Sequence, residues 1–219
     1  MEPSDNMTSV KWLDCIDSTN AELRRNIDSI DNLSVLATKE QTAGRGQGCH
    51  TWYASPGKNL TFSIMLKSEM GSVFAICASD ALLLTCVASL SVRAYLADKG
   101  ISARIKWPND IWVEDKKICG MLIENRLDGS HIKESIIGIG LNINETHWPE
   151  ELPNPISLSE LSHESYNIED ELQIFLQVFV KHYLMLETTQ GREYLLKEFN
   201  ANVFKLGEER LSLLPDLQP

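Results

Sequence analysis

The pattern of apolar and polar positions along the chain changes near residue 100. Before that point, short apolar runs alternate with polar loops, and the longest apolar stretch, Val73 to Asp98, predicts a helix packed on a sheet and ended by Gly100. After it, β-rich runs separated by turn-like segments predict consecutive antiparallel strands. Helical spacing of apolar residues then predicts two helices, over residues 168–186 and 192–204.

Strands and helices that are segregated in this way predict an α+β fold rather than an alternating parallel one. A short helix is expected over residues 21–25, after several N-cap candidates at residues 17–20. Residues 40–59 have no periodicity and carry three closely spaced glycines, so we expect a long loop there with a functional role. The predicted strands cover residues 11–16, 35–38, 60–66, 103–107, 111–113, 118–123 and 135–143.

Composition limits the classes of function. The 219 residues are 43% hydrophobic with a net charge of −11, which excludes general disorder and argues against a nucleic-acid-binding surface. Five cysteines without a CxxC pair favour a reducing compartment over a disulfide framework. Residues 1–8 show no signal peptide, so we expect a cytoplasmic protein without a membrane span, and a homodimer is one expectation for its assembly.

The loop at residues 41–48 has the composition of an anion-binding site. Gly44, Gly46 and Gly48 allow backbone N–H groups to point together at an anion, and Arg45 adds a permanent cation with a planar donor fork. The alternative is a flexible, solvated loop with an unrelated arginine. The residues alone leave both readings open.

Three further segments carry residues suited to the same chemistry. Lys106 lies on a β-rich run before Asn109 and Asp110, Lys117 opens a later strand, and Gly138 and Gly140 interrupt another strand. A lysine on a strand suits a phosphate, and glycines inside a strand suit a closely approaching ligand. Turn hydrogen bonds and solvated edge charge are the alternatives. Together the segments predict one nucleotide or phosphate site.

Five motifs in this order resemble the motif set of the biotin protein ligases, the biotin–[acetyl-CoA-carboxylase] ligases. The resemblance covers residues 10–186 and indicates the monofunctional type, because residues 1–10 leave no room for an N-terminal DNA-binding domain. The motifs are residues 17–20 (DSTN), 41–46 (QTAGRG), 106–111 (KWPNDI), 117–124 (KICGMLIE) and 138–144 (GIGLNIN).

The resemblance implies a mixed sheet backed by helices, like that of class II aminoacyl-tRNA synthetases. It implies that biotin and MgATP form biotinyl-5′-AMP and that biotin then passes to a lysine of a biotin carboxyl carrier protein or domain. It also implies a catalytic domain over residues 1–186, followed over residues 187–219 by a helix and the remnant or truncated start of a small β domain.

The resemblance assigns roles to residues as well. Lys117, Arg45 and Asp110 match catalytic positions, and Asp110 is also a candidate metal ligand. Biotin would be bound by Ser18, Thr19, Asn20, Gln41, Arg45, Gly46, Gln47, Lys117, Gly120, Gly138 and Gly140. ATP would be bound by Arg45, Trp52, Lys106, Asn109, Lys117 and Asn142.

The loop departs from the family pattern after Gly46. It reads Gln47-Gly48-Cys49-His50, where the family usually carries another basic residue or two. Two rival readings follow from this and from the shared fold: a lipoate or octanoate ligase or transferase, and a biotin-binding paralogue without transfer activity. The segment 44–46 together with 106–110 favours biotin over lipoate.

Overall fold

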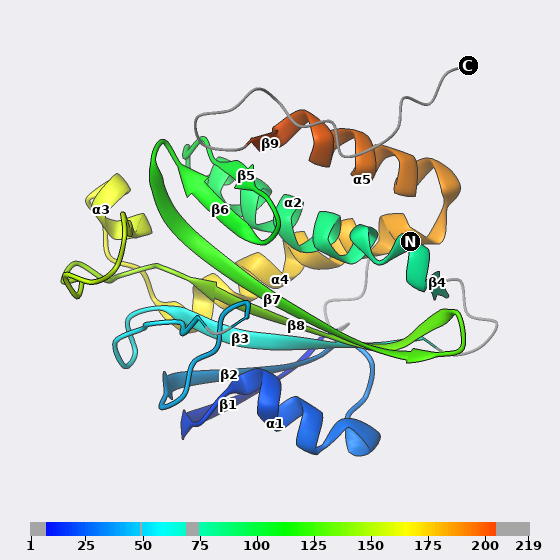
Figure 1. Cartoon of the computed structure of the whole chain (residues 1–219). Coiled ribbons are helices and arrows are strands. Elements are labelled where there is room, and N and C mark those ends of the chain that lie inside the picture. Colours follow the sequence, from blue (N-terminus) through cyan, green and yellow to red (C-terminus); the bar gives the residue numbers. More distant parts are fainter. Residues whose placement is uncertain (1–7, 49, 69–74, 205–219) are drawn as a thin grey trace.

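One mixed sheet forms the centre of the molecule, and helices cover both of its faces (Figure 1). The structure is a computed structural model that describes residues 8–48, 50–68 and 75–204. The strand order is β1-β2-β3-β8-β7-β6-β5-β9, and β4 pairs with β8 beside this path. The strands are β1 (Ser9–Ile16), β2 (Ser34–Gln41), β3 (Leu60–Lys67), β4 (Ile76–Cys77), β5 (Arg104–Lys106), β6 (Asp110–Val113), β7 (Lys116–Asp128), β8 (His131–Leu141) and β9 (Val203–Phe204).

Parallel pairing occurs at the two ends of this sheet. Strands β1 and β2 are parallel, as are β5 and β9, whereas the pairs from β2 to β5 are antiparallel. The sheet is therefore mixed, and the predicted α+β class is confirmed. The helices are α1 (Thr19–Arg25), α2 (Leu82–Asp98), α3 (Leu158–Ser162), α4 (Ile168–Leu184) and α5 (Thr189–Asn202), with short 3-10 turns η1 (Ile27–Ser29), η2 (Ala78–Asp80) and η3 (Met185–Glu187).

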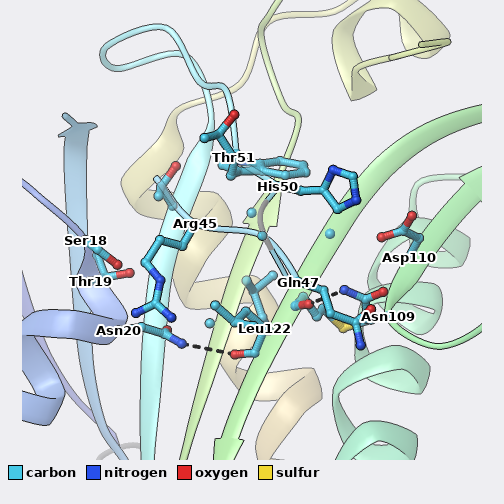
Figure 2. A pocket seen from close by; sticks show the side chains of 18 of the residues that line it. Ser18, Thr19, Asn20, Arg45, Gln47, His50, Thr51, Asn109, Asp110 and Leu122 are labelled. Atoms are coloured by element: carbon cyan, nitrogen blue, oxygen red, sulfur yellow. Dashed lines mark hydrogen bonds between the residues drawn. The ribbon is translucent and has the colours of Figure 1, made fainter. Parts of the chain in front are cut away.

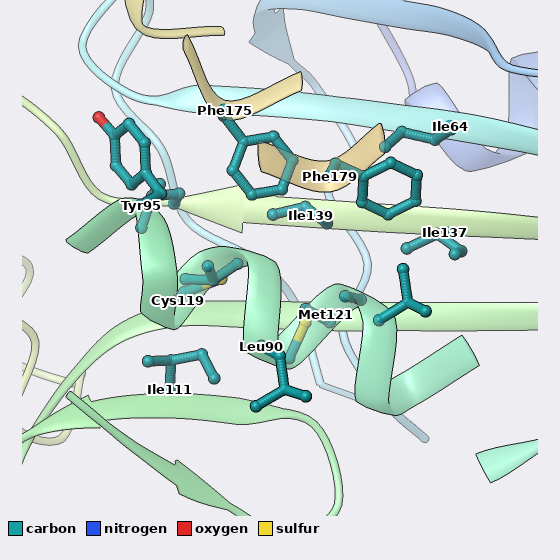
Figure 3. Close-up of a cluster of buried hydrophobic side chains, with 14 of the residues drawn as sticks. Ile64, Leu90, Tyr95, Ile111, Cys119, Met121, Ile137, Ile139, Phe175 and Phe179 are labelled. Carbon is teal, nitrogen blue, oxygen red and sulfur yellow. The ribbon is translucent and has the colours of Figure 1, made fainter. Parts of the chain in front are cut away.

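Alternation along the strands divides the core between the two faces of the sheet. Val35 and Ala37 of β2 join the main core under α2, α4 and α5, whereas Leu36 between them packs with Leu23 of α1. Successive side chains of a strand point to opposite faces, so α1 lies on the face away from the long helices (Figure 1). Phe175 of α4 belongs to the main core, close to β8 (Figure 3).

The face of the sheet that carries α1 also carries polar side chains. Strand β3 is buried along nearly its whole length, yet Thr61 and Ser63 point to the side of α1 while their apolar neighbours enter the main core. Gly138 and Gly140 lie opposite Ser63 and Thr61 in the register of β3 and β8. This face therefore offers hydrogen-bonding groups over a floor without side chains.

Most of the predicted elements are confirmed, and the start of the long helix is not. The antiparallel runs from residue 103 to 143 are strands β5 to β8. Helix α2 begins only at Leu82, because Ile76–Cys77 pairs with β8 and a 3-10 turn follows. The predicted helix over residues 192–204 begins earlier, at Thr189, and ends at Asn202, where β9 begins. Residues 73 and 74 of the expected helix lie outside the described residues.

The segment Ala78–Asp98 is long and apolar enough, by length and composition, to cross a membrane. In the structure 61% of its most apolar window is buried, and it packs against α4, α5 and the sheet. The core helix of a protein can pass the same test of length and composition. The sequence predicted such a helix here, packed on the sheet. Helix α5 lies on α2, and β9 pairs with β5, so residues 189–204 contact the helices and sheet before them. The expected start of a small β domain, residues 205–219, lies outside the described residues.

Candidate active site

The glycine-rich loop forms a flap, described over residues 42–48 and 50–52, that folds back on itself. Gly46 N–H donates to the His50 carbonyl at 2.8 Å, and Trp52 N–H donates to the Gly44 carbonyl at 3.0 Å. A Cβ on Gly44 would lie 2.4 Å from the Trp52 carbonyl oxygen, so this crossing requires glycine. The fold of the flap brings Arg45 to the face of the sheet that carries α1 (Figure 2). Trp52 lies against Gly140 on the same face.

The first turn of α1 supplies a buried polar wall. Ser18 is the N-cap, and its hydroxyl accepts a hydrogen bond from Ala21 N–H. Thr19 donates to Gln41 Oε1 through its N–H (2.8 Å) and through its hydroxyl (3.2 Å). Ser63 of β3 contacts Thr19 Oγ1 at 2.7 Å and Asn20 Oδ1 at 2.6 Å. These groups orient one another, so the wall is fixed without a ligand.

Glycines form the floor of the site because other atoms occupy the places of their side chains. A Cβ on Gly138 would lie 2.2 Å from Asn20 Oδ1, and a Cβ on Gly140 would lie 2.2 Å from Trp52 Cε2. A Cβ on Gly120 would lie 2.8 Å from the same indole. The Trp52 indole therefore lies flat on β7 and β8. Its Nε1 is buried and has no hydrogen-bond partner among the described residues.

Strands β6 and β7 bring a lysine and a carboxylate together. Lys117 Nζ lies 2.7 Å from Asp110 Oδ1, with the two side chains 31% and 19% exposed. The lysine also lies 5.5 Å from the centre of the Trp52 ring. The preceding turn is tied to β7, since Asn109 Nδ2 donates to the Met121 carbonyl at 2.7 Å. Lys106 makes a cation–π contact with Trp112, with Nζ 4.0 Å from the ring centre.

All these elements surround one cavity of about 290 Å³ (Figure 2). Arg45, Lys106 and Lys117 make its lining cationic, and Asp110 is the one carboxylate among its described lining residues. The predicted site residues that line it are Ser18, Thr19, Asn20, Gln41, Arg45, Gly46, Gln47, Trp52, Lys106, Asn109, Asp110, Lys117, Gly120, Gly138 and Gly140. A small cationic pocket is thus present on a protein with a net charge of −11.

Asn142 is the predicted site residue that does not line this cavity. It is buried, and its side-chain amide donates to the Ile156 carbonyl at 3.0 Å and to the Lys117 carbonyl at 3.4 Å. These bonds hold the start of β7, where Lys117 lies. A role of Asn142 in ATP binding stays a prediction.

Sequence reasoning missed Thr61 and Ser63. Thr61 lines the cavity, and Ser63 lies behind it and holds Thr19 and Asn20. The signal was present, since these two polar residues are spaced two apart in the apolar strand LTFSIML, on the same face.

Metal ligands are sparse in the described part of the chain. No group of three or more His, Cys, Asp or Glu residues that could hold a metal ion occurs there. Asp110, the predicted metal ligand, is already paired with Lys117. A magnesium ion would therefore have to bring most of its ligands with it, as it does when bound to ATP phosphates.

Comparison with known families agrees with the motif order. The sequence profile of the biotin/lipoate A/B protein ligase family matches residues 12–142, more than half of the chain. The chain belongs to this family. Among family proteins, it is 34% identical over 154 residues to the bifunctional ligase/repressor BirA of Bacillus spizizenii, a match that covers 68% of this chain and 46% of that protein. It is 27% identical to the biotin–[acetyl-CoA-carboxylase] ligase of Paracoccus denitrificans over 88% of this chain and 80% of the relative.

Solved structures of the family have the same fold. The biotin protein ligase of Aquifex aeolicus in complex with biotin and ATP superposes with a TM-score of 0.73 at 25% identity, covering 91% of this chain and 80% of that one. The predicted class, a mixed sheet backed by helices like that of class II aminoacyl-tRNA synthetases, is thereby confirmed. The sequence match to BirA of Bacillus spizizenii spans less than half of the length of that bifunctional protein.

Proposed function

We propose that the chain activates biotin with MgATP to biotinyl-5′-AMP, releasing pyrophosphate, and transfers biotin to a lysine of a biotin carboxyl carrier domain. One observation carries the proposal: Arg45 of the flap and Lys117 of β7 line the same cavity, above a glycine floor. Membership of the family and its biotin ligases support the choice of substrate.

The first step joins two anions, the biotin carboxylate and the α-phosphate of ATP. Their repulsion is the barrier that the site must lower, and fixed cations aimed at both are the direct means. Lys117 is placed for this role because Asp110 holds its ammonium at 2.7 Å beside the cavity. Arg45 adds a bidentate donor fork from the flap. In this proposal Lys117 spans the carboxylate and the α-phosphate and stabilises the charge that builds up as the bond forms.

The α1 wall suits the other end of biotin. A ureido ring has two N–H donors and a carbonyl acceptor, and side-chain hydroxyls and amides match these groups. Ser18, Thr19, Asn20 and Gln41 are oriented by their own hydrogen bonds, so little freedom is lost when a ligand binds. Gly138 and Gly140 let Asn20 and Trp52, which line the cavity, lie close against the sheet.

The nucleotide is proposed to lie toward Trp52, Lys106 and Asn109. The Trp52 indole lies beside Lys117 and offers an aromatic ring to a nucleotide base. Magnesium would enter bound to the ATP phosphates and neutralise part of their charge, and Asp110 would be the carboxylate of this site that could ligate it. After activation, the incoming carrier lysine attacks the mixed anhydride and AMP leaves.

The direct test mixes the protein with MgATP, biotin and a biotin carboxyl carrier domain, and measures pyrophosphate and biotinylated carrier. We expect both products, each dependent on biotin. Pyrophosphate without labelled carrier would replace the proposal with a protein that activates biotin and does not transfer it. Activity with lipoate or octanoate in place of biotin would overturn it.

A further inference from the structure

Three donors, two from α1 and one from the flap, converge on one carboxylate, that of Glu124 on β7. Asn20 Nδ2 lies 2.8 Å from Glu124 Oε2. The guanidinium groups of Arg24 and Arg45 both donate through Nη2 to the other oxygen, Oε1, Arg45 at 3.3 Å. Glu124 is 19% exposed and lies behind the cavity wall rather than among its lining residues.

The three donors differ in how freely they can leave. Asn20 is buried and also bonded to the Leu122 carbonyl and Ser63, and Arg24 is anchored on α1. Arg45 belongs to the flap, is 47% exposed and lines the cavity (Figure 2). When Arg45 turns to the acid of a ligand, Glu124 keeps Arg24 and Asn20 and is not left as an unpaired charge. The exchange of partners therefore avoids the cost of stranding a carboxylate.

We propose that Glu124 is a positioning residue that holds Arg45, and with it the flap, in the resting site and competes with the substrate acid for Arg45. Arg24 sets the strength of this hold, because its guanidinium shares Oε1 and reduces the charge that Arg45 experiences. The identity of the acid, biotin, rests on the proposed function.

This competition predicts effects of opposite sign for two substitutions. Glu124→Gln removes the charge that holds Arg45, so the empty flap opens more often and Arg45 is easier for a ligand to capture. Arg24→Gln leaves the Glu124 charge to Arg45 alone, so the flap opens less often and the ligand binds more weakly. A purely structural Glu124 predicts the same sign for both variants, since each loses an interaction.

The experiment measures hydrogen exchange of the Gly46 and Trp52 amides in the ligand-free protein, and then biotin affinity by calorimetry. From the size of exposed ion pairs we expect exchange roughly two- to five-fold faster in Glu124→Gln and slower by a similar factor in Arg24→Gln. Biotin should bind more tightly to the first variant and more weakly to the second. The primary amide of biotin, which lacks the acid, should bind both variants as it binds the unmodified protein.

The matched control is Arg25→Gln, which removes the same charge from α1 but contacts Asp17 and Glu22 instead of Glu124. It should leave flap exchange unchanged. Destabilisation makes amide exchange faster, so slower exchange in Arg24→Gln cannot arise from it. The Arg24→Gln result therefore tests the proposal even if Glu124→Gln folds poorly. Unchanged exchange in Arg24→Gln, or a change of the same sign in both variants, overturns the proposal. Opposite shifts without any biotin binding would instead overturn the proposed function and leave the hold on Arg45 standing.

Discussion

Two lysine–carboxylate pairs in this molecule have the same separation but different surroundings. Lys117–Asp110 borders the cavity, and Lys99–Glu171 joins α2 to α4; the nitrogen–oxygen distance is 2.7 Å in both. The Lys99 pair is the more buried, with side chains 16% and 8% exposed. The two distances are equal, so distance does not distinguish the pair between the helices from the pair that we propose is catalytic. The surroundings of each pair do.

The surroundings of Lys99 are filled by protein. Tyr95 OH donates to Glu171 at 2.6 Å, and the Lys99 ammonium lies over the rings of Tyr95 and Tyr166. Burial, with Glu171 beside it, raises the pKa of Tyr95 far above its usual range, which keeps the hydroxyl a donor. The Lys117 pair instead faces a cavity that a ligand can enter. Protein groups surround the Lys99 pair, whereas in the proposed function the substrate would complete the surroundings of the Lys117 pair.

Among the substitutions that test this comparison, the one at Lys117 should have the largest effect, and the effect is on catalysis. Lys117→Ala should lower the rate of adenylate formation by about 10²–10³-fold, because one aligned donor to the developing charge is lost. Biotin should still bind measurably, since the α1 wall is intact. Pyrophosphate release and calorimetric binding of biotin check the two parts separately.

Lys116→Ala is the matched control for Lys117→Ala. Lys116 is the neighbouring residue on β7 and is exposed to solvent. It should retain the full rate of adenylate formation. Turnover near normal in Lys117→Ala would remove the lysine from the mechanism proposed above.

The second effect concerns stability. Lys99→Met leaves the buried Glu171 carboxylate without its cation, and broken buried pairs cost about 3–5 kcal/mol in free energy of unfolding. For a chain of this size that corresponds to roughly 6–20 °C in melting temperature. Thermal or urea denaturation measures it. At temperatures where the variant is folded, adenylate formation should be unchanged.

Removing both charges sharpens the same contrast. The double variant Lys99→Met, Glu171→Gln should recover much of the lost stability, because no uncompensated charge remains and the amide oxygen still accepts from Tyr95. Lys39→Met breaks an exposed pair with Asp14 and should leave the melting temperature where it was. Equal losses in Lys99→Met and Lys39→Met would show that burial does not distinguish the two pairs.

The fold could be predicted where the pattern is local and not where partners are distant. The runs that became β5 to β8 follow one another along the chain, so alternation and turns were sufficient to predict them. The pairing of Ile76–Cys77 with β8 depends on Ile132 and His131, 56 and 54 positions away, and an apolar run alone does not separate such a strand from a helix. Helix α3 carried a local signal that was missed: Ser157 and Glu160 form a capping box.

For the candidate site too, local features could be predicted from the sequence and distant partners could not. The charged and glycine positions were predicted from residue type, but the sequence does not show that Arg45 has Glu124 as a partner, 79 positions away. Nor does it show that Asn142 turns to the backbone at Lys117 and Ile156 instead of the cavity. Motif order predicts which residues gather, and only packing determines which of them face the ligand.

The smallest expected effect is a pH dependence of the free energy of unfolding that arises from a histidine of α4, the helix that carries Glu171. His182 of α4 lies between Ser91 Oγ (3.2 Å from Nδ1) and the Val178 carbonyl (3.1 Å), and burial lowers its pKa below the usual 6.5. The unfolded chain therefore takes up the proton first as the pH falls through 6.5, so this residue costs stability on the acid side and costs none above that pH. His182→Asn keeps a donor near Val178 and does not titrate. Its free energy of unfolding, measured by urea denaturation, should fall less between pH 7 and 5 than that of the unmodified protein, by no more than one proton's contribution. Parallel pH profiles for the two proteins would mean that His182 is protonated as readily in the folded helix layer as in the unfolded chain.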